Sequence, residues 1–270
     1  MFDGVQCPSI LLQLIATGKP LSTAGMMIED RTRTYTIAME RTVVPENFSF
    51  RMTDEEYRVL EKIKNSIPVC YLADHADFAL GIVTGNNKKF LSAEKTEHSE
   101  MVLKGTDICK YHINPVKQYL RFEPEQFQQV APLEIYRAPE KLLYRFISNQ
   151  LVVAYDDRQM LSLNSCNIVI PKIEGMQIKY ILAILNSSVS QFVYQKEFHS
   201  IKVLRAHMEH IPIPRVGKAI QNEIIAMTEP LICGMGKEAA ETCQKRLDCR
   251  IMDLFRLSAE EQWIIRHALH

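Results

Sequence analysis

The stretch A-L-G-I-V-T-G-N-N-K-K-F at residues 79–90 decides how the rest of the chain is interpreted. Its apolar first half, residues 80–83, predicts a buried strand, and the glycine and asparagines that follow predict a tight polar turn. Lys88 and Lys89 then place two positive charges beside backbone N–H groups. Such a turn suits an anion or a nucleic-acid backbone, but an ordinary surface turn has the same composition.

The chain has 270 residues, 47% hydrophobic and 24% charged, which is typical of one large or two small globular domains. Its 32 basic residues balance 32 acidic ones, so a surface for nucleic acid must come from local clusters. No apolar run reaches the length of a membrane span, and Asp3 stands where a signal peptide needs positive charge. With seven scattered cysteines and no C-x-x-C pair, we expect free thiols in a reducing cytoplasm and no structural zinc.

The first two thirds of the chain contain mainly strand signals. Residues 5–16 and 33–44 are expected to be strands, which need a larger sheet to be stable. The capping box T-D-E-E at residues 53–56 opens a helix that runs to about residue 65. Between residues 78 and 170, short strand-like segments alternate with polar turns. This pattern predicts a compact, mostly antiparallel β recognition subdomain.

From residue 176 the apolar period becomes helical. Apolar side chains recur every three or four positions over residues 176–193 and predict a buried helix. Further helices are expected at residues 219–233 and 237–255, and a second capping box, S-A-E-E at 258–261, opens a last one. The fold class is therefore α+β, a mostly antiparallel subdomain followed by C-terminal helices. The predicted domains are residues 1–50, 51–215 and 216–270.

Catalytic motifs are missing from the sequence. It lacks the phosphate-binding loop, the dinucleotide fingerprint, the nucleophile elbow and H-E-x-x-H, and N-P-V at 114–116 only partly matches the N/D-P-P-Y/F motif of amino-methyltransferases. Asp156 and Asp157 are expected in a solvated turn, with a metal-dependent nuclease site as the alternative. Three histidines are expected at the surface, with phosphate binding as the alternative: His199, His207 and His210.

Positive charge gathers in two segments. Residues 81–121 carry seven basic and four acidic side chains, and residues 195–222 carry five basic and two acidic ones. Each segment therefore has a net charge of plus three. The tyrosines, asparagines and glutamines among them suit contacts to phosphates and base edges. A mixed-charge surface without a ligand is the other interpretation of each segment.

Four segments follow one another in an order that is typical of one family. They are G-I-V-T-G-N-N-K-K-F at 81–90, L-K-G-T-D-I-C-K-Y at 103–111, Y-I-L-A-I-L-N-S-S-V-S-Q-F at 180–192 followed by I-P-I-P at 211–214, and R-L-D-C-R-I-M-D-L-F-R-L-S-A-E-E at 246–261. Together they resemble the TaqI-like C-terminal specificity (target-recognition) domain of adenine-N6 DNA methyltransferases and fused type II restriction–modification enzymes. Residues 2–44 resemble the last strands of the methyltransferase domain that precedes it.

The resemblance implies that the chain recognises a DNA target sequence for a restriction–modification methyltransferase in the cytoplasm. The catalytic and S-adenosylmethionine motifs of that family lie upstream and are absent here. The chain alone is therefore not expected to methylate DNA or to hold a cofactor. It would be a C-terminal fragment or a split subunit, and its partners would be double-stranded DNA and a methyltransferase catalytic domain or subunit that binds S-adenosylmethionine.

The resemblance and the basic segments together give the candidate DNA-binding residues. Lysine and arginine side chains are expected to hold phosphates, while asparagines face the DNA. Two alternatives stay open, a helical protein-interaction or scaffolding module and the metal-dependent nuclease. The candidates are Gly85, Asn86, Asn87, Lys88, Lys89, Lys104, Lys110, Lys117, Tyr119, Arg121, Lys202 and Arg205.

Overall fold

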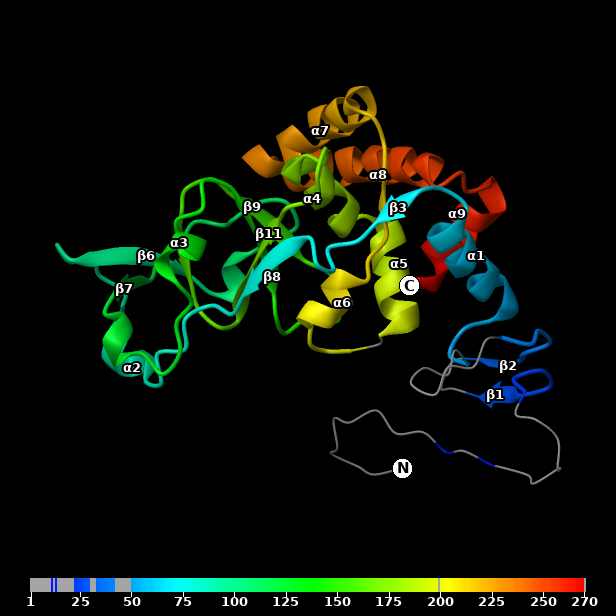
Figure 1. Ribbon diagram of the computed structural model, residues 1–270, viewed down its shortest axis with the longest axis horizontal. Helices are drawn as coiled ribbons and strands as arrows, with labels where there is room; N and C mark the ends of the chain where they lie inside the picture. The colour runs from blue at the N-terminus through cyan, green and yellow to red at the C-terminus, as the bar shows by residue number, and fades with distance from the viewer. Residues whose placement is uncertain are drawn as a thin grey trace. The chain divides into compact units, whose positions relative to one another are not determined.

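The computed structural model describes residues 11, 13, 22–29, 33–41, 50–198 and 200–269 (Figure 1). They belong to two compact units, Met1–Asp54 and Glu55–His270. The strand predicted at residues 5–16 lies outside the described residues, apart from Leu11 and Gln13. The domain boundary expected after residue 215 stays a prediction.

The first unit contains a short antiparallel strand pair. β1 (Met27–Glu29) pairs with β2 (Thr34–Thr36), with Ile28 opposite Tyr35. β2 lies within the strand predicted at residues 33–44 but is shorter, and residues 42–44 are outside the described part. The sequence does not predict β1 as its partner, because a three-residue strand carries too little alternation to be recognised.

Asp54 holds residues 38–41 of the first unit. Its Oδ2 atom accepts hydrogen bonds from the backbone N–H groups of Ala38 at 2.8 Å and Met39 at 3.1 Å. Its Oδ1 atom accepts one from Nη2 of the buried Arg41 at 2.8 Å. Burial by itself would raise the pKa of Asp54, but these hydrogen bonds outweigh burial and lower it below its usual value.

Two four-stranded sheets form the β part of the second unit. The first has the order β4-β11-β8-β9 and is antiparallel. The second has the order β10-β6-β7-β5, with β10 parallel to β6 and the other neighbours antiparallel. The strands are β4 (Ala76–Ala79), β5 (Leu91–Ser92), β6 (Ser99–Leu103), β7 (Tyr119–Arg121), β8 (Lys141–Arg145), β9 (Val153–Asp156), β10 (Leu161–Ser162) and β11 (Cys166–Pro171).

A single hydrophobic cluster joins the two sheets. It contains Val102 and Leu120 from the second sheet and Leu143 and Ile168 from the first, all of them fully buried. Burial of each such side chain contributes on the order of 2 kcal/mol. Because successive residues of a strand point to opposite faces, the neighbours of Leu120 in β7 point away from this core.

Two glycines let the β part pack backbone against backbone. A Cβ atom on Gly81 would lie 2.1 Å from the carbonyl oxygen of Leu163, and one on Gly105 would lie 2.4 Å from that of Ser165. Both glycines therefore face the same segment, which leads into β11. Only a residue without a side chain fits at either position.

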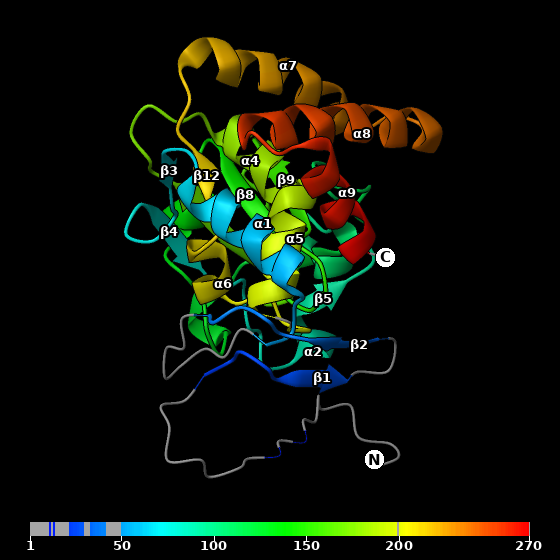
Figure 2. The ribbon, with the colours of Figure 1, turned by 90° about the vertical axis from the view of Figure 1, so that its right-hand side faces the viewer.

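The C-terminal part is helical, which confirms the predicted fold class. The helix predicted over residues 176–193 is interrupted at Ser187, whose Oγ atom accepts from the N–H of Ser190 and donates to the carbonyl of Ile184. Figures 1 and 2 show α7 beside α8, and α4 packs against α7. The helices are α4 (Ile178–Asn186), α5 (Ser188–Glu197), α6 (Arg205–Glu209), α7 (Lys218–Cys233), α8 (Lys237–Leu254) and α9 (Ala259–Ala268).

The second capping box has the expected geometry. The Oγ atom of Ser258 accepts from the N–H of Glu261, and Oε2 of Glu261 accepts from the N–H of Ser258 at 2.6 Å. The same Oε2 atom lies 2.6 Å from Nζ of Lys62 in α1 (Asp54–Asn65). α1 confirms the helix predicted at residues 53–65. The ion pair between Lys62 and Glu261 joins this helix to the start of α9.

The I-P-I-P segment is extended, as its prolines predict. β12 (Ile213–Pro214) pairs antiparallel with β3 (Val69–Cys70), the strand that follows α1. Tyr180 of α4 donates its hydroxyl proton to the carbonyl of Pro214 at 2.9 Å. The two ends of the β part are thus joined next to α4.

Candidate nucleic-acid interface

The stretch at residues 79–90 folds differently from the predicted strand and turn. β4 ends at Ala79, and Ile82 and Val83 form only isolated bridges to other segments. Gly85 adopts a positive φ of 76°, which explains the glycine. The last four residues form one helical turn, α2 (Asn87–Phe90), in place of a tight turn.

Asn86 and Asn87 fix this helical turn. The Oδ1 atom of Asn86 accepts from the N–H of Lys89 at 3.3 Å, as an N-cap does. Thr84 donates its hydroxyl proton to Oδ1 of Asn87 at 2.6 Å. Both asparagines are engaged locally, and the exposed Lys88 and Lys89 carry the positive charge of α2.

A row of polar side chains connects α2 with β7. Nζ of Lys89 donates to Oε1 of Gln126 at 3.2 Å, and Nε2 of Gln126 donates to Oε2 of Glu123 at 2.9 Å. Nε of Arg121 lies 2.8 Å from Oε1 of the same Glu123. Lys89 and Arg121, which are distant in sequence, therefore belong to one surface. We call Lys88, Lys89, Gln126, Glu123 and Arg121 the cation row.

The outer face of β7 continues the cation row. Tyr119 and Arg121 point away from the core because Leu120 between them points into it. Tyr119 lies opposite Met101 of β6, whose side chain is 45% exposed. Lys117 is exposed just before the strand. Five predicted residues thus come from β7, from the segment just before it and from α2, which leads into β5: Tyr119, Arg121, Lys117, Lys88 and Lys89.

Lys104 and Lys110 serve the structure of the turn between them. The backbone N–H of Lys104 donates to Oδ2 of Asp107 at 2.7 Å, which closes the 3-10 turn η1 (Gly105–Asp107). Nζ of Lys110 donates to the carbonyl of Asn186, at the end of α4, at 3.2 Å. Burial lowers the pKa of Lys110, and the carboxylate of Asp248 only partly offsets it. Because Lys110 is only partly exposed and its ammonium is already bonded to Asn186, we leave it out of the surface.

Lys202 and Arg205 lie beside the first sheet. Nζ of Lys202 lies 5.9 Å from the ring centre of Phe146, and the guanidinium of Arg205 lies 5.3 Å from that of Phe78. Nε of Arg205 is also 2.7 Å from Oε1 of Glu209. These contacts place both cations at the ends of β4 and β8, away from the cation row.

The predicted histidines have different surroundings. His199 lies outside the described residues, and His210 is exposed. His207 is half-buried, and its ring stacks on Phe198 with 4.5 Å between ring centres. Burial lowers the pKa of His207, so it is a packing residue and the surface position expected for it is wrong.

The prediction that Asp156 and Asp157 lie in a solvated turn is wrong for Asp156. Asp156 is fully buried, with Oδ2 only 2.6 Å from Nζ of the equally buried Lys141. Its carboxylate also accepts from the backbone N–H groups of Arg158 and Met160. Asp157 is exposed. Within the described ranges, no group of three or more His, Cys, Asp or Glu residues could hold a metal ion.

The family segments at 103–111 and 180–192 meet at β9. The side chain of Asn186 accepts from the N–H of Val153 at 3.0 Å and donates to its carbonyl at 2.8 Å. Tyr111 is buried with φ at 75°, and its backbone bonds to Val153 and Tyr155. These residues hold the scaffold, a role that sequence reasoning missed because the motif pattern does not separate scaffold from contact residues.

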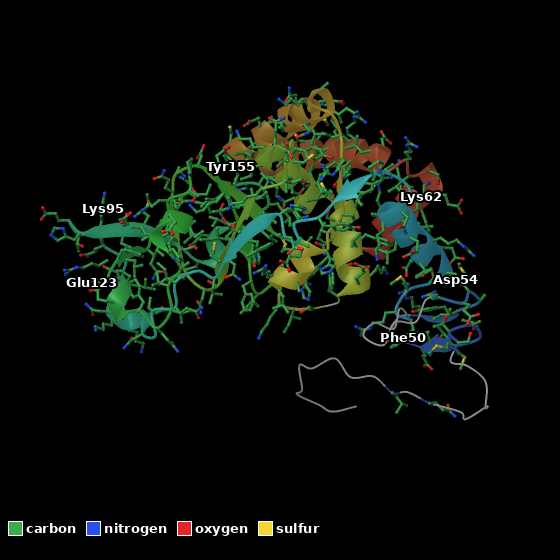
Figure 3. All side chains as sticks on the ribbon, viewed as in Figure 1. Phe50, Asp54, Lys62, Lys95, Glu123 and Tyr155 are labelled. Carbon is green, nitrogen blue, oxygen red and sulfur yellow. The ribbon has the colours of Figure 1, made fainter. Side chains whose placement is uncertain are left out.

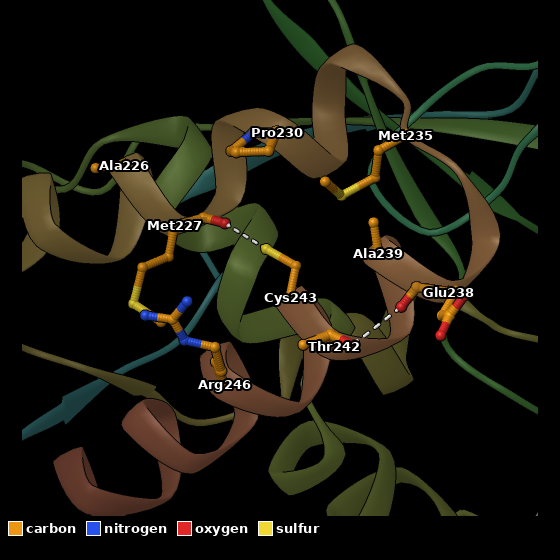
Figure 4. Close-up of a pocket in the computed structure, with 9 residues that line it drawn as sticks. All are labelled: Ala226, Met227, Pro230, Met235, Glu238, Ala239, Thr242, Cys243 and Arg246. Carbon is orange, nitrogen blue, oxygen red and sulfur yellow. Dashed lines mark hydrogen bonds between the residues drawn. The ribbon is translucent and has the colours of Figure 1, made fainter.

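A groove lies between α7 and α8, with a cavity volume of about 640 Å³ (Figure 4). Pro230 has no N–H for the carbonyl of Ala226, which borders the groove. Cys243 donates its thiol proton to the carbonyl of Met227 at 3.3 Å. The lining of the groove is mainly apolar and consists of Ala226, Met227, Pro230, Met235, Glu238, Ala239, Thr242, Cys243 and Arg246.

The fold is α+β, and its β part carries the basic and aromatic side chains of the cation row and β7. Residues 100–213 match the family described as the TaqI-like C-terminal specificity domain. The resemblance expected from the sequence is therefore confirmed over this part of the chain. No curated protein matches the chain. None of the described helices combines the length and apolarity needed to cross a membrane.

Several solved structures have a similar chain path. A chain of a type I R-M system is 13% identical, with a TM-score of 0.43, over 80% of this chain and 52% of that chain. The HsdS subunit from Thermoanaerobacter tengcongensis is 13% identical, with a TM-score of 0.39, over 80% of this chain and 50% of that one. The type IIL restriction-modification enzyme MmeI, solved in complex with DNA, is 11% identical, with a TM-score of 0.47, over 74% of this chain and 35% of that one. The chain therefore spans about half or less of the solved chains that it matches.

Proposed function

We propose that this chain recognises a double-stranded DNA target for a restriction–modification system. Its partner would be the catalytic domain or subunit of an adenine-N6 methyltransferase. The observation that carries the proposal is the cation row, because three of its members, Arg121, Glu123 and Gln126, lie in the range that matches the specificity-domain family. Phosphate contacts fix the register of a protein on duplex DNA, and base contacts then select the sequence.

The cation row suits phosphates for a geometric reason. Glu123 and Gln126 hold Arg121 and Lys89 in fixed positions, so less side-chain freedom is lost when a phosphate binds. Lys88 adds an exposed charge beside them. Tyr119 offers an aromatic face and a hydroxyl group on the same side of the sheet.

Methyl transfer would belong to the partner. S-adenosylmethionine is bound in that family by motifs that this sequence lacks. The groove between α7 and α8 does not fit the cofactor either, because two helices wall it and it contains no glycine turn between a strand and a helix. We therefore assign no step of the reaction to this chain beyond gripping and reading the duplex while the partner acts on the flipped adenine.

A salt titration tests the proposal. Fluorescence anisotropy with a labelled duplex would give the affinity of the chain at several salt concentrations. We expect the logarithm of the affinity to fall linearly with the logarithm of salt concentration, by roughly 0.9 for each phosphate contact. Replacing Lys88 and Lys89 by alanine should reduce this slope by about two. Lys245→Ala, at an exposed position of α8, is the matched control and should leave it unchanged.

The groove favours a second candidate function, a module that docks on a partner protein through α7 and α8. This alternative predicts no salt-sensitive affinity for duplex DNA, either alone or with a methyltransferase partner present. It also predicts that Met227→Asp, in the groove, abolishes partner binding while the Lys88 and Lys89 changes do not. The same titration therefore separates the two functions.

A further inference from the structure

The connection between β5 and β6 has an unusual path. Both strands are antiparallel to β7 and lie on opposite sides of it, so residues 93–98 must pass from one side of β7 to the other. Every residue of this connection is exposed. Figure 3 shows Lys95 at the end of the β part that is farthest from the C-terminal helices. We call residues 93–98 the crossing loop.

Two serines shape the backbone of the crossing loop. Oγ of Ser92 accepts from the N–H of Glu94 at 3.0 Å. Oγ of Ser99 accepts from the N–H of Thr96 at 2.7 Å and donates to the carbonyl of Thr96 at 3.1 Å. The loop is therefore held in one conformation without using its own charged side chains. Such preorganisation reduces the entropy that is lost on binding.

The charged side chains of the loop have no partner in the described part of the chain. The side chains of Glu94, Lys95, Glu97 and His98 form no hydrogen bond or ion pair with the residues that the structure describes. Arg121 differs, because it is held by Glu123. The loop thus presents free acceptors and donors on a fixed backbone.

The crossing loop adjoins the cation row. Ser99, which closes the loop, lies directly opposite Arg121 in the register of β6 and β7. A duplex whose phosphates contact Arg121 and Lys89 would have its groove beside the loop. Two carboxylates next to phosphates repel them and cost affinity, unless they face base edges.

The chemistry of the loop indicates one kind of base pair. In the major groove, a carboxylate accepts a hydrogen bond from N4 of cytosine, and a lysine donates to O6 and N7 of guanine. Resting on the proposed function, we propose that the crossing loop enters the major groove and reads a C·G pair. One of the two carboxylates, Glu94 or Glu97, accepts from the free N4–H of cytosine, and Lys95 donates to guanine.

Selection from a library of randomised duplexes tests this assignment with the full chain. We expect the wild-type chain to enrich sites with a C·G pair at a fixed position. The double variant Glu94→Gln, Glu97→Gln should lose the preference at that position by about ten-fold, the cost of one base contact. Glu174→Gln, an exposed glutamate in another loop, is the matched control and should keep the preference.

The selected duplex is then synthesised with N4-methylcytosine at the preferred position. The wild-type chain should bind it about ten-fold more weakly, whereas the double variant should bind both duplexes equally. If the wild type and the double variant enrich the same site equally, or the site has no fixed C·G pair, the inference is overturned while DNA recognition stands. If the wild-type chain enriches no sequence, the proposed function itself fails.

Discussion

The backbone N–H of Ser188 donates a hydrogen bond to Oδ1 of Asp248 at 2.8 Å. Ser188 begins α5 and Asp248 lies in α8, so the bond joins two segments that the sequence shows only as separate motifs. Gln244 donates to the second carboxylate oxygen at 3.2 Å. The pKa of Asp248 is raised because burial outweighs these bonds and the nearby charge of Lys110. The carboxylate thus caps α5 from another helix.

Asp248→Ala should lower the free energy of unfolding by about 1–3 kcal/mol, because the N–H of Ser188 loses its acceptor. Chemical denaturation followed by circular dichroism measures the change. Glu241→Ala, at an exposed position of the same helix, is the control and should change stability by less than about 0.5 kcal/mol. Equal stabilities of the two variants would show that the cap contributes nothing.

Gly81→Ala should destabilise the chain by about 1–3 kcal/mol, because the new Cβ forces two backbone segments apart. The nearest atoms are the carbonyl oxygens of Leu163 at 2.1 Å and Cys166 at 2.7 Å. Gly236→Ala provides the comparison, since a Cβ there meets nothing within 4 Å. Thermal unfolding should give a much smaller shift of Tm for the second variant. A shift of the same size in both would argue against the close approach.

Asp156→Ala should be among the most damaging single changes, costing about 3–5 kcal/mol, because it leaves the ammonium of Lys141 buried without its counter-charge. Replacing both residues, Lys141→Met with Asp156→Leu, should recover the part of that loss that comes from the unpaired ammonium, although the N–H groups of Arg158 and Met160 still lack their acceptor. Denaturation curves of the three proteins measure this. Asp157→Ala, next in sequence but exposed, should stay close to wild type. A double variant as unstable as Asp156→Ala would contradict the explanation.

Asp54 should make the first unit sensitive to acid. Its pKa is lower in the folded chain than in the unfolded one, so its contribution is complete above about pH 4. The contribution is lost as the pH falls through the lower, folded value, because protonation removes the charge that Ala38, Met39 and Arg41 contact. The amide proton shifts of Ala38 and Met39, followed by NMR, should titrate there.

Two variants control the acid titration. Asp54→Asn should abolish the titration of those amide shifts, since it removes the charge at every pH. Glu55→Gln should leave it intact, because Glu55 is exposed. Amide shifts that titrate in Asp54→Asn as in the wild type would assign the effect to another group.

Elements with strong local signals are predictable from this sequence. The Ser258–Glu261 capping box marks the start of α9 because both side chains act within one turn. Gly234 likewise follows the last residue of α7, with a positive φ of 78°. The interruption at Ser187 is not predictable from periodicity, because the apolar residues continue on both sides of it.

Features that depend on distant contacts are not predictable in this way. Lys141 and Asp156 lie opposite each other only because of the register of β8 and β9, so their burial needs the sheet. The cation row joins Lys89 and Arg121 through Gln126 and Glu123, and no spacing in the sequence indicates these contacts. Local charge could place Lys110 in a basic segment, but the bond to Asn186 decides its role.

The contacts of Asn186 and Tyr111 have a consequence for association. β9 is the last strand of its sheet, and such a strand normally offers free backbone groups to another chain. Here the side chain of Asn186 and the backbone of Tyr111 occupy the outward N–H and carbonyl groups of Val153, and Tyr111 also accepts from the N–H of Tyr155. A foreign strand can therefore add to the sheet at β9 only by displacing them, so the residues that fasten the scaffold also protect it from edge-to-edge aggregation.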